Sequence, residues 1–189
     1  EADLKPKGVS CLFGDYVSQD DKNSEANAYK LDQGGLGMPS RDYYFKTDAR
    51  TETIRTAYKQ YLLKTFKQLG NDDMAAQKDA EAVYALETKL AKASRKLEDL
   101  RDPYKNYNKM NEGELSKLVP NINWANFTKN IGITKLDSVI VGQPEFYTEL
   151  NHEITSTNIS DWKNYLRFHL IQSYSGFLDS VSFNNAFTY

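Results

Sequence analysis

The sequence predicts a mainly α-helical fold, with a long antiparallel pair of helices and a small β-hairpin or short sheet near the N-terminus. Apolar side chains recur every three or four residues between Ile54 and Leu97, which is the period of an amphipathic helix. β-branched and aromatic residues, which favour strands, gather instead before position 32. Between these regions, the run Leu31–Tyr44 contains Gly and Pro at positions that interrupt regular structure, so it marks a junction.

The N-terminal part is expected to contain two extended segments, Val9–Ser18 and Ala26–Leu31. Between them, Gln19–Asn27 is rich in Asp, Asn, Ser and Lys, which predicts a turn. The result is a β-hairpin or a ragged pair of strands that needs a further surface for stability. The single cysteine, Cys11, lies in an apolar-leaning run, so it is expected to be a buried small hydrophobe rather than a catalytic thiol.

The junction itself allows a structural and a ligand-binding interpretation. Gly34, Gly35 and Gly37 permit positive φ or a close approach of two backbones. Ser40 stands where a helix N-cap would, with Asp42 in the first turn. The alternative, a phosphate cradle, is disfavoured because GGLG matches neither GxGxxG nor GxxxxGK[ST]. A structural crossing is the favoured interpretation.

Two long helices should follow. The first begins at Asp48, and Gly70 is expected as the residue just beyond its end. The second begins at Asp72 or Asp73 and should run to about Asp99, before an Asp-Pro pair stops it. A connection of a few residues predicts an antiparallel hairpin. Their tyrosines are expected in the core or at a packing edge: Tyr58, Tyr61 and Tyr84.

Shorter elements are expected after the Asp-Pro pair. Asn111 with Glu114 has the form of a capping box and opens a helix through Leu118. Asn123 caps another short helix, Trp124–Ile131.

The chain then returns to an extended segment before its last helices. Ser138–Val141 is a candidate strand that could pair with the early β region. Pro144 starts a helix to about Ile154, and Thr157 or Ser160 opens the last one. One face of that helix is expected to carry Trp162, Leu166, His169, Leu170, Ser173 and Phe177.

Composition excludes several classes. The net charge of −2 and the lack of a basic stripe argue against a nucleic-acid surface. No run approaches the roughly 18 apolar residues of a membrane span, and Glu1–Gly8 lacks the apolar stretch of a signal peptide. One cysteine favours a bacterial relative or a reducing compartment, because secreted vertebrate proteins of this size usually carry several.

Five segments also occur in a recognisable order. LDQGGLGMPSRDYY (Leu31–Tyr44) and LEDLRDPYKNYNKM (Leu97–Met110) are the longest, and DDKNS, ALETKLA (Ala85–Ala91) and NWANFT (Asn123–Thr128) lie before, between and after them. Together they resemble the neprilysin-type zinc metallopeptidases, which include neprilysin, the endothelin-converting enzymes and bacterial relatives. The match rests on Asp32, Gln33, Leu36, Gly37, Pro39, Ser40, Arg41, Asp42, Tyr43 and Tyr44, and on Arg101, Asp102, Pro103, Tyr107, Asn108, Lys109 and Met110.

The resemblance covers nearly the whole chain from Cys11. It implies that residues 1–189 form a single domain, a fragment of the family's larger, mostly helical N-terminal domain. That domain is a lid over the catalytic domain, and the two enclose a chamber that admits peptides. The zinc-bearing catalytic domain is expected to lie outside this chain, after Tyr189. The parent's own catalytic domain and peptide substrates are the implied partners. The implied localisation of the parent is extracytoplasmic: periplasmic, secreted or membrane-anchored.

Zinc chemistry in this family requires HExxH on a helix, where two histidines one turn apart bind the metal and the Glu acts as general base. His152-Glu153 begins such a motif, but Ser156 stands at the position of the second histidine. The other histidine, His169, is far more than one turn away. We therefore expect no metal, catalytic or known substrate residue in this chain. A different site built from His152, Glu153 and His169 is the minority interpretation.

Two Arg-Asp pairs lie in the densest motifs, Arg41-Asp42 and Arg101-Asp102. Both stand at predicted helix boundaries, where forked salt bridges or caps that lock a chain crossing are favoured over a functional role.

Three functions remain open from the sequence. The first is a non-catalytic lid segment of a zinc metalloendopeptidase, inactive when isolated. The second is a stand-alone helical module that binds peptides without cutting them. The third and weakest is an independent enzyme with an unrecognised carboxylate site.

Overall fold

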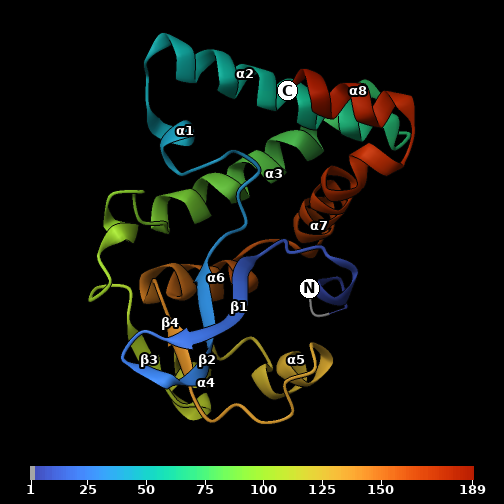
Figure 1. The fold of residues 1–189 in the computed structure, drawn as a ribbon. Coiled ribbons are helices and arrows are strands. Elements are labelled where there is room, and N and C mark those ends of the chain that lie inside the picture. The colour runs from blue at the N-terminus through green and yellow to red at the C-terminus, as the bar shows by residue number, and fades with distance from the viewer. Residues whose placement is uncertain (1–2) are drawn as a thin grey trace. The chain divides into compact units, whose positions relative to one another are not determined.

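The structure is a computed structural model that describes residues 3–189 (Figure 1). Contacts among its residues divide the chain into two compact units. The first joins the N-terminal part, up to Gly35, with Ala93–Ser156. The second joins Leu36–Lys92 with Thr157–Tyr189. The run Leu31–Tyr44 therefore contains the first connection between the two units, as its Gly and Pro residues predict.

The first unit contains short helices around a sheet, and the second is helical. Elements of the first are η1 (Lys5–Lys7), β1 (Phe13–Asp20), β2 (Asn23–Gln33), η2 (Asp99–Arg101), β3 (Asn108–Met110), α4 (Glu112–Leu118), α5 (Trp124–Asn130), β4 (Val139–Val141) and α6 (Pro144–Ser156). Those of the second are α1 (Asp42–Phe45), α2 (Ala49–Gln68), α3 (Asp73–Ala93), α7 (Ile159–Tyr174), η3 (Ser175–Phe177) and α8 (Ser180–Thr188). The mainly helical class with an N-terminal hairpin is confirmed.

The sheet has the strand order β1-β2-β4-β3. β1 and β2 form the predicted antiparallel hairpin, and β4 returns to pair with β2 in parallel, Tyr29 opposite Val139. β3 pairs antiparallel with β4 at the edge. We did not predict β3, because its three residues, Asn-Lys-Met, carry no alternation that distinguishes a strand from a loop.

The turn of the hairpin is tighter than predicted. Strand pairing continues to Asp20 opposite Asn23, so most of the expected turn Gln19–Asn27 is strand. The carboxylate of Asp20 accepts a hydrogen bond from the Lys22 amide at 2.9 Å, which closes the turn locally. Most of the polar residues that suggested a loop instead lie on an exposed end of the two strands, whereas Asp20 is buried.

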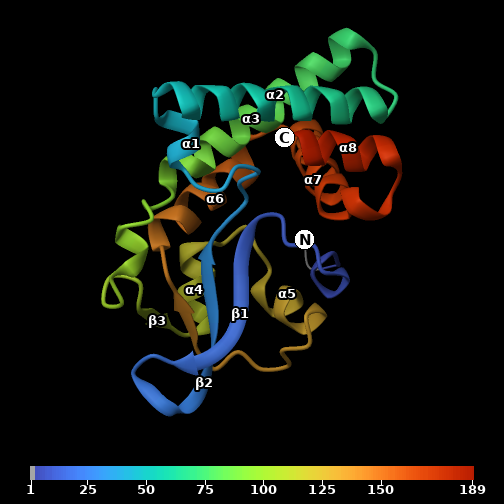
Figure 2. The same ribbon diagram turned by 45° about the horizontal axis from the view of Figure 1, so that its top comes forward.

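One face of the sheet forms the core of the first unit. Phe13 on β1 packs against Trp124 and Phe127 of α5 and against Tyr147 of α6, with ring centroids 5.4–5.8 Å apart. Figure 2 shows α4 and α5 behind the hairpin. Both short helices have the predicted side-chain caps. Asn111 forms a capping box with Glu114, and Asn123 accepts a hydrogen bond from the Asn126 amide.

In the second unit, α2 and α3 run antiparallel from a tight connection. An ion pair joins Lys67 to Asp73 at 2.8 Å beside the connection, and Lys59 lies over the ring of Tyr84 further along both helices. Gly70 has φ +95° just beyond the end of α2, as predicted.

The second long helix ends earlier than predicted, at Ala93 instead of about Asp99. Gln33 explains the difference. Its side-chain oxygen accepts from the Arg95 amide at 2.6 Å, and its side-chain nitrogen donates to the Arg95 carbonyl at 3.0 Å. The backbone groups that a longer helix would pair internally are thus satisfied by a side chain 62 residues away.

The predicted N-cap role of Ser40 is wrong. α1 begins at Asp42, its N-cap residue is Arg41, and no side chain caps it. Ser40 contributes only its carbonyl, which accepts from the Tyr43 amide at 3.2 Å.

The C-terminal part also differs from the prediction. α7 buries Trp162, Asn164, Tyr165, Phe168 and His169, so Leu166 and Leu170 lie beside the buried face and Ser173 is exposed. Phe177 is 86% exposed, because the chain leaves the helical path in η3. We did not predict α8, although Asp179 caps it by accepting from the Ser182 amide, a D-x-x-S signal. Within residues 3–189, no helix combines the length and apolarity needed to cross a bilayer.

Candidate functional site

The two histidines lie in different units. His152 is exposed on α6 of the first unit beside buried Glu153, whereas His169 is buried on α7 of the second unit. Across residues 3–189, no three His, Cys, Asp or Glu side chains lie close enough together to hold a metal ion.

His169 instead belongs to a buried polar cluster around Glu87 of α3. The Glu87 carboxylate accepts hydrogen bonds from the Tyr44 hydroxyl at 2.9 Å and from the Tyr58 hydroxyl at 2.7 Å. The His169 Nε2 atom lies 2.9 Å from the carboxylate, but its N–H direction is too oblique for a good hydrogen bond. Burial, and then the charge of Glu87, raise the pKa of both tyrosines. Both phenols therefore stay protonated and donate.

Sequence reasoning missed this cluster. Glu87 lies in the ALETKLA match, but a Glu within an amphipathic helix is usually solvated, so nothing marked it as buried. Tyr58 was expected in the core, and it is fully buried.

The glycines of the junction are required by close packing. A Cβ at Gly34 would lie 2.8 Å from the Cα of Phe13, and a Cβ at Gly37 would overlap the Tyr58 hydroxyl. Gly35 has φ +75°. These constraints support the structural crossing that the sequence favours over a phosphate cradle.

The first Arg-Asp pair has a structural role, though not through the expected forked salt bridge. The Arg41 Nε atom donates to the Ala91 carbonyl in the last turn of α3 at 3.3 Å. Its guanidinium lies 5.5 Å from the centre of the Phe45 ring. Asp42 pairs with Lys46 at 2.8 Å. Cys11 is likewise structural, being 1% exposed, as predicted.

The second pair separates into two roles. The Asp102 carboxylate accepts from the amides of Lys105 and Tyr104 at 3.1 and 3.0 Å, and these bonds lower its pKa. Asp102 therefore holds the turn after η2. The Arg101 side chain is exposed and makes no hydrogen bond or ion pair to the part of the chain that the structure describes.

Arg101 lines a polar pocket of about 440 Å³ in the first unit. Tyr16, Lys30 and Ile140 are in register on three neighbouring strands, so they project from the sheet face opposite the Phe13 core. The lining residues are Tyr16, Asp21, Lys30, Asp32, Gln33, Leu100, Arg101, Pro103, Asn106, Ile140 and Gln143. Both motifs that carry the family resemblance thus contribute to one pocket.

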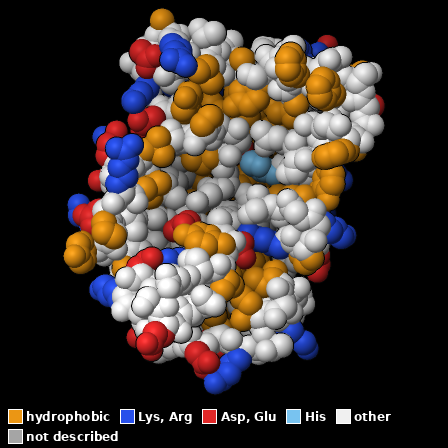
Figure 3. Space-filling model, viewed as in Figure 1, with side chains coloured by type: hydrophobic (Ala, Val, Ile, Leu, Met, Phe, Trp, Pro, Cys, Tyr) orange, Lys and Arg blue, Asp and Glu red, His pale blue; other side chains and the backbone are white. Residues whose placement is uncertain are grey.

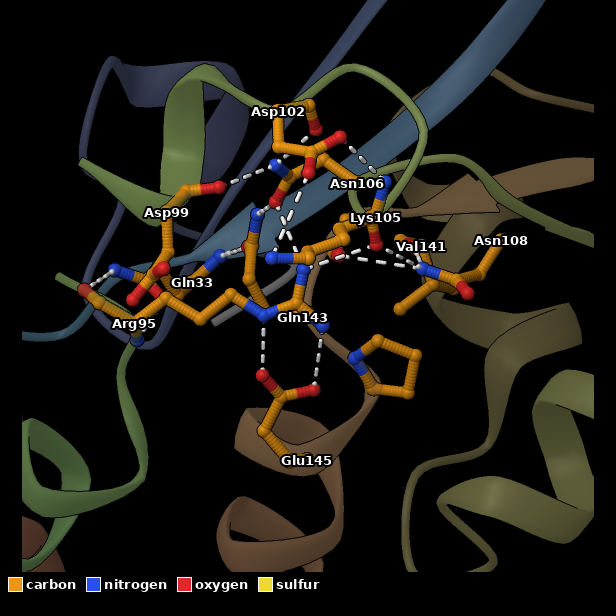
Figure 4. Close-up of polar contacts among 12 residues, drawn as sticks. Gln33, Arg95, Asp99, Asp102, Lys105, Asn106, Asn108, Val141, Gln143 and Glu145 are labelled. Carbon is orange, nitrogen blue, oxygen red and sulfur yellow. Dashed lines mark hydrogen bonds and ion pairs between the residues drawn. The ribbon is translucent and has the colours of Figure 1, made fainter. Parts of the chain in front are cut away.

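A network of amides fixes one wall of the pocket (Figure 4). The Gln143 side chain accepts from the Gln33 amide at 2.7 Å and donates to the Asn106 side chain at 2.8 Å. Arg95, which holds Gln33 through its backbone, points its guanidinium at both carboxylate oxygens of Glu145. This ion pair anchors the wall to the start of α6.

Charged groups occupy the rest of the pocket. The Lys30 ammonium is mostly buried and pairs with Asp21 at 2.7 Å. The Tyr16 hydroxyl donates to the Asp32 carboxylate at 3.1 Å. Partial burial and the nearby Asp32 charge raise the pKa of Tyr16 to about 12, so the hydroxyl keeps its proton at neutral pH. The pocket therefore presents both signs of charge on a fixed wall.

Comparison with known proteins defines the class. The sequence model described as Peptidase family M13 matches residues 2–189. The chain therefore belongs to peptidase family M13, the neprilysin and endothelin-converting enzyme family, and it corresponds to the N-terminal domain.

Individual relatives are consistent with this. Endothelin-converting enzyme 1 of Homo sapiens is 35% identical over 177 residues, which is 90% of this chain and 23% of that enzyme. Neprilysin-3 of Drosophila melanogaster is 31% identical over 189 residues, covering 94% of this chain and 24% of the relative. The chain thus spans about a quarter of the length of these relatives.

Solved structures share the fold. The zinc metalloprotease Zmp1 of Mycobacterium tuberculosis in its open state superimposes with a TM-score of 0.91 and 26% identity, over 98% of this chain and 29% of Zmp1. Zmp1 in complex with an inhibitor gives the same TM-score.

Proposed function

We propose that this chain is a non-catalytic part of the N-terminal domain of a longer zinc metalloendopeptidase that cleaves peptides. The observation that carries the proposal is the family match over residues 2–189 combined with coverage of only 23% of the endothelin-converting enzyme. The relatives are named as zinc metalloprotease or converting enzyme, and no HExxH sequence occurs in these 189 residues. In this proposal zinc and the catalytic residues come from the rest of the parent.

The role of the segment would be to form part of the lid that closes a peptide chamber over the catalytic domain and limits substrate size. Its partners would be the parent's own catalytic domain and the enclosed peptides, and the parent would work outside the cytoplasm. Polar groups that are satisfied within the chain support such a role: Glu87 and the Gln33–Gln143 network are hydrogen-bonded internally. A size filter must keep its shape.

An exposed apolar surface also supports a larger parent. Within the second unit, large apolar side chains gather over η3 and α8 (Figure 3). We call the exposed residues of this surface the α8 patch: Phe177, Leu178, Val181, Phe183 and Phe187. Clusters of this kind usually mark an interface.

The second candidate is a stand-alone peptide-binding module. The observation that favours it is the polar pocket, which offers charged groups of both signs without any other domain.

The test compares peptidase activity of this chain with that of the protein encoded by a longer reading frame. Both are assayed on one short peptide, with zinc and with a chelator. Chelator-sensitive cleavage by the longer protein and none by this chain is expected. Cleavage by this chain alone would overturn the proposal, and the absence of any longer reading frame would favour the binding module.

A further inference from the structure

The polar pocket of the first unit contains charged groups that the fold does not use. The amides of Gln33, Asn106 and Gln143 bond to one another or to backbone groups, so this wall is already formed. Lys30 and Asp21 pair with each other and offset their charges. The charged groups that are left to bind a ligand are Arg101 and Asp32.

Arg101 and Asp32 are available in different ways. The guanidinium of Arg101 has five N–H donors and no ion pair or hydrogen bond to any described residue. The Asp32 carboxylate receives one side-chain hydrogen bond, from the Tyr16 hydroxyl, and no described cation pairs with it. Since both line one pocket, the pocket offers one group for an anion and one for a cation.

We propose that this pocket binds a short zwitterionic peptide, whose carboxylate pairs with Arg101 and whose ammonium group is held by Asp32. Guanidinium binds carboxylate through two parallel hydrogen bonds, and the Asp32 carboxylate can accept from an ammonium while Tyr16 keeps it oriented. The choice of a peptide rests on the proposed function. The charge pattern favours a zwitterion over simpler ligands, because Asp32 repels a plain anion and Arg101 repels a plain cation.

The dimensions agree with a small ligand. The pocket volume of about 440 Å³ lies within the roughly 300–1,000 Å³ of small-molecule sites. One wall of the pocket is fixed by the Gln33–Asn106–Gln143 bonds, so binding requires little rearrangement of that wall.

The test is a titration of the isotope-labelled 189-residue chain with the dipeptide alanylalanine, followed by NMR. Saturable shifts are expected at the Arg101 side chain and at the backbone of Asp32. Amidation of the dipeptide carboxylate should weaken binding about tenfold or more, because it removes a charge-assisted pair. Acetylation of its amine should weaken binding similarly.

Variants assign each end of the ligand. With Arg101→Gln, the amidated and free dipeptides should bind equally weakly. The acetylated dipeptide should still bind more weakly than the free dipeptide. With Asp32→Asn the pattern should reverse. Arg167→Gln, at an exposed arginine of α7, is the charge-matched control and should bind as the unchanged chain does. Arg101 is exposed, so its variant keeps the test valid even if Asp32→Asn fails to fold.

Three results would overturn the inference: no saturable shift, equal binding by Arg101→Gln and the unchanged chain, or inorganic phosphate binding as tightly as the dipeptide. The proposed function is tested separately. If the longer protein cleaves peptides but this chain binds no dipeptide, only the pocket assignment fails. If this chain binds the dipeptide and the longer protein is inactive, the lid proposal fails and the binding module is supported.

Discussion

At the scale of single residues, Glu87 shows how a charge can be retained in a core. Its carboxylate is fully buried, and two phenol hydroxyls donate to it from α1 and α2. Glu87→Gln should destabilise the chain by about 1.5–3 kcal/mol, because charge-assisted hydrogen bonds are lost and an amide N–H is turned towards a phenol. Urea unfolding followed by circular dichroism measures this. Glu81→Gln, on the exposed face of α3, is the control and should change stability by less than about 0.5 kcal/mol. Equal stability of the two variants would contradict the argument.

Asp20 gives a prediction for pH at the same scale. The Lys109 ammonium, the Lys22 amide and the Tyr107 hydroxyl bond to its carboxylate and lower its pKa from the ordinary 3.8 to about 2. A lowered folded-state pKa means that the stabilisation is present above about pH 4 and is lost as the pH falls through about 2.

The melting temperature of the unchanged chain should therefore fall more steeply between pH 4 and 2 than that of Asp20→Asn, and the gap between them should close with acid. Asp137→Asn, which breaks an exposed ion pair with Lys135, should follow the unchanged chain at every pH. A gap that stays constant down to pH 2 would show that Asp20 acts by packing alone.

At the scale of elements, the sequence predicted most reliably those boundaries whose signals are local. The capping box at Asn111 and the glycine at position 70 gave helix ends correctly, because the partner groups lie within one turn. The end of α3 was wrong because its partner is Gln33, 62 residues away. β3 was missed for a similar reason, since its pairing with β4 alone makes it a strand.

The crossing segment offers a test of element packing. Gly37 faces the Tyr58 hydroxyl of α2 so closely that a methyl group would overlap it. Gly37→Ala should therefore displace Tyr58 from Glu87 and cost about 1–3 kcal/mol of stability, as overpacking usually does. Gly176→Ala is the control, because a Cβ there meets no atom within 4 Å. Thermal unfolding compares the two, and an unchanged melting temperature for Gly37→Ala would contradict the steric account.

At the scale of the whole molecule, the family and the helical class could be predicted from the sequence, whereas the polar pocket could not. Asp32 and Arg101 each lie in a recognised motif, but only the pairing of β2 with β4 and the turn held by Asp102 make them line one pocket. A sequence motif gives residue types in order, and their meeting depends on strand register. The sequence therefore favours a structural role for Arg101, because the motif alone does not show that Arg101 lines a pocket.

The α8 patch carries the last prediction, because its state depends on how much polypeptide surrounds it. Phe177 and Phe187 are 86% and 79% exposed, so in the 189-residue chain they should promote self-association at raised concentration. Replacing both with Ser should shift sedimentation towards the monomer without lowering the melting temperature. If the patch is covered in a longer parent, the same change there should destabilise the protein, since it removes buried apolar area.

Lys78→Ser with Lys92→Ser, on exposed positions of α3, is the control for a double change at the surface. Should the double Phe variant leave the longer protein as stable as this control does, the α8 patch would face solvent in the parent as well. The α8 patch would then be a surface that contacts another molecule, and it would not be buried inside the parent.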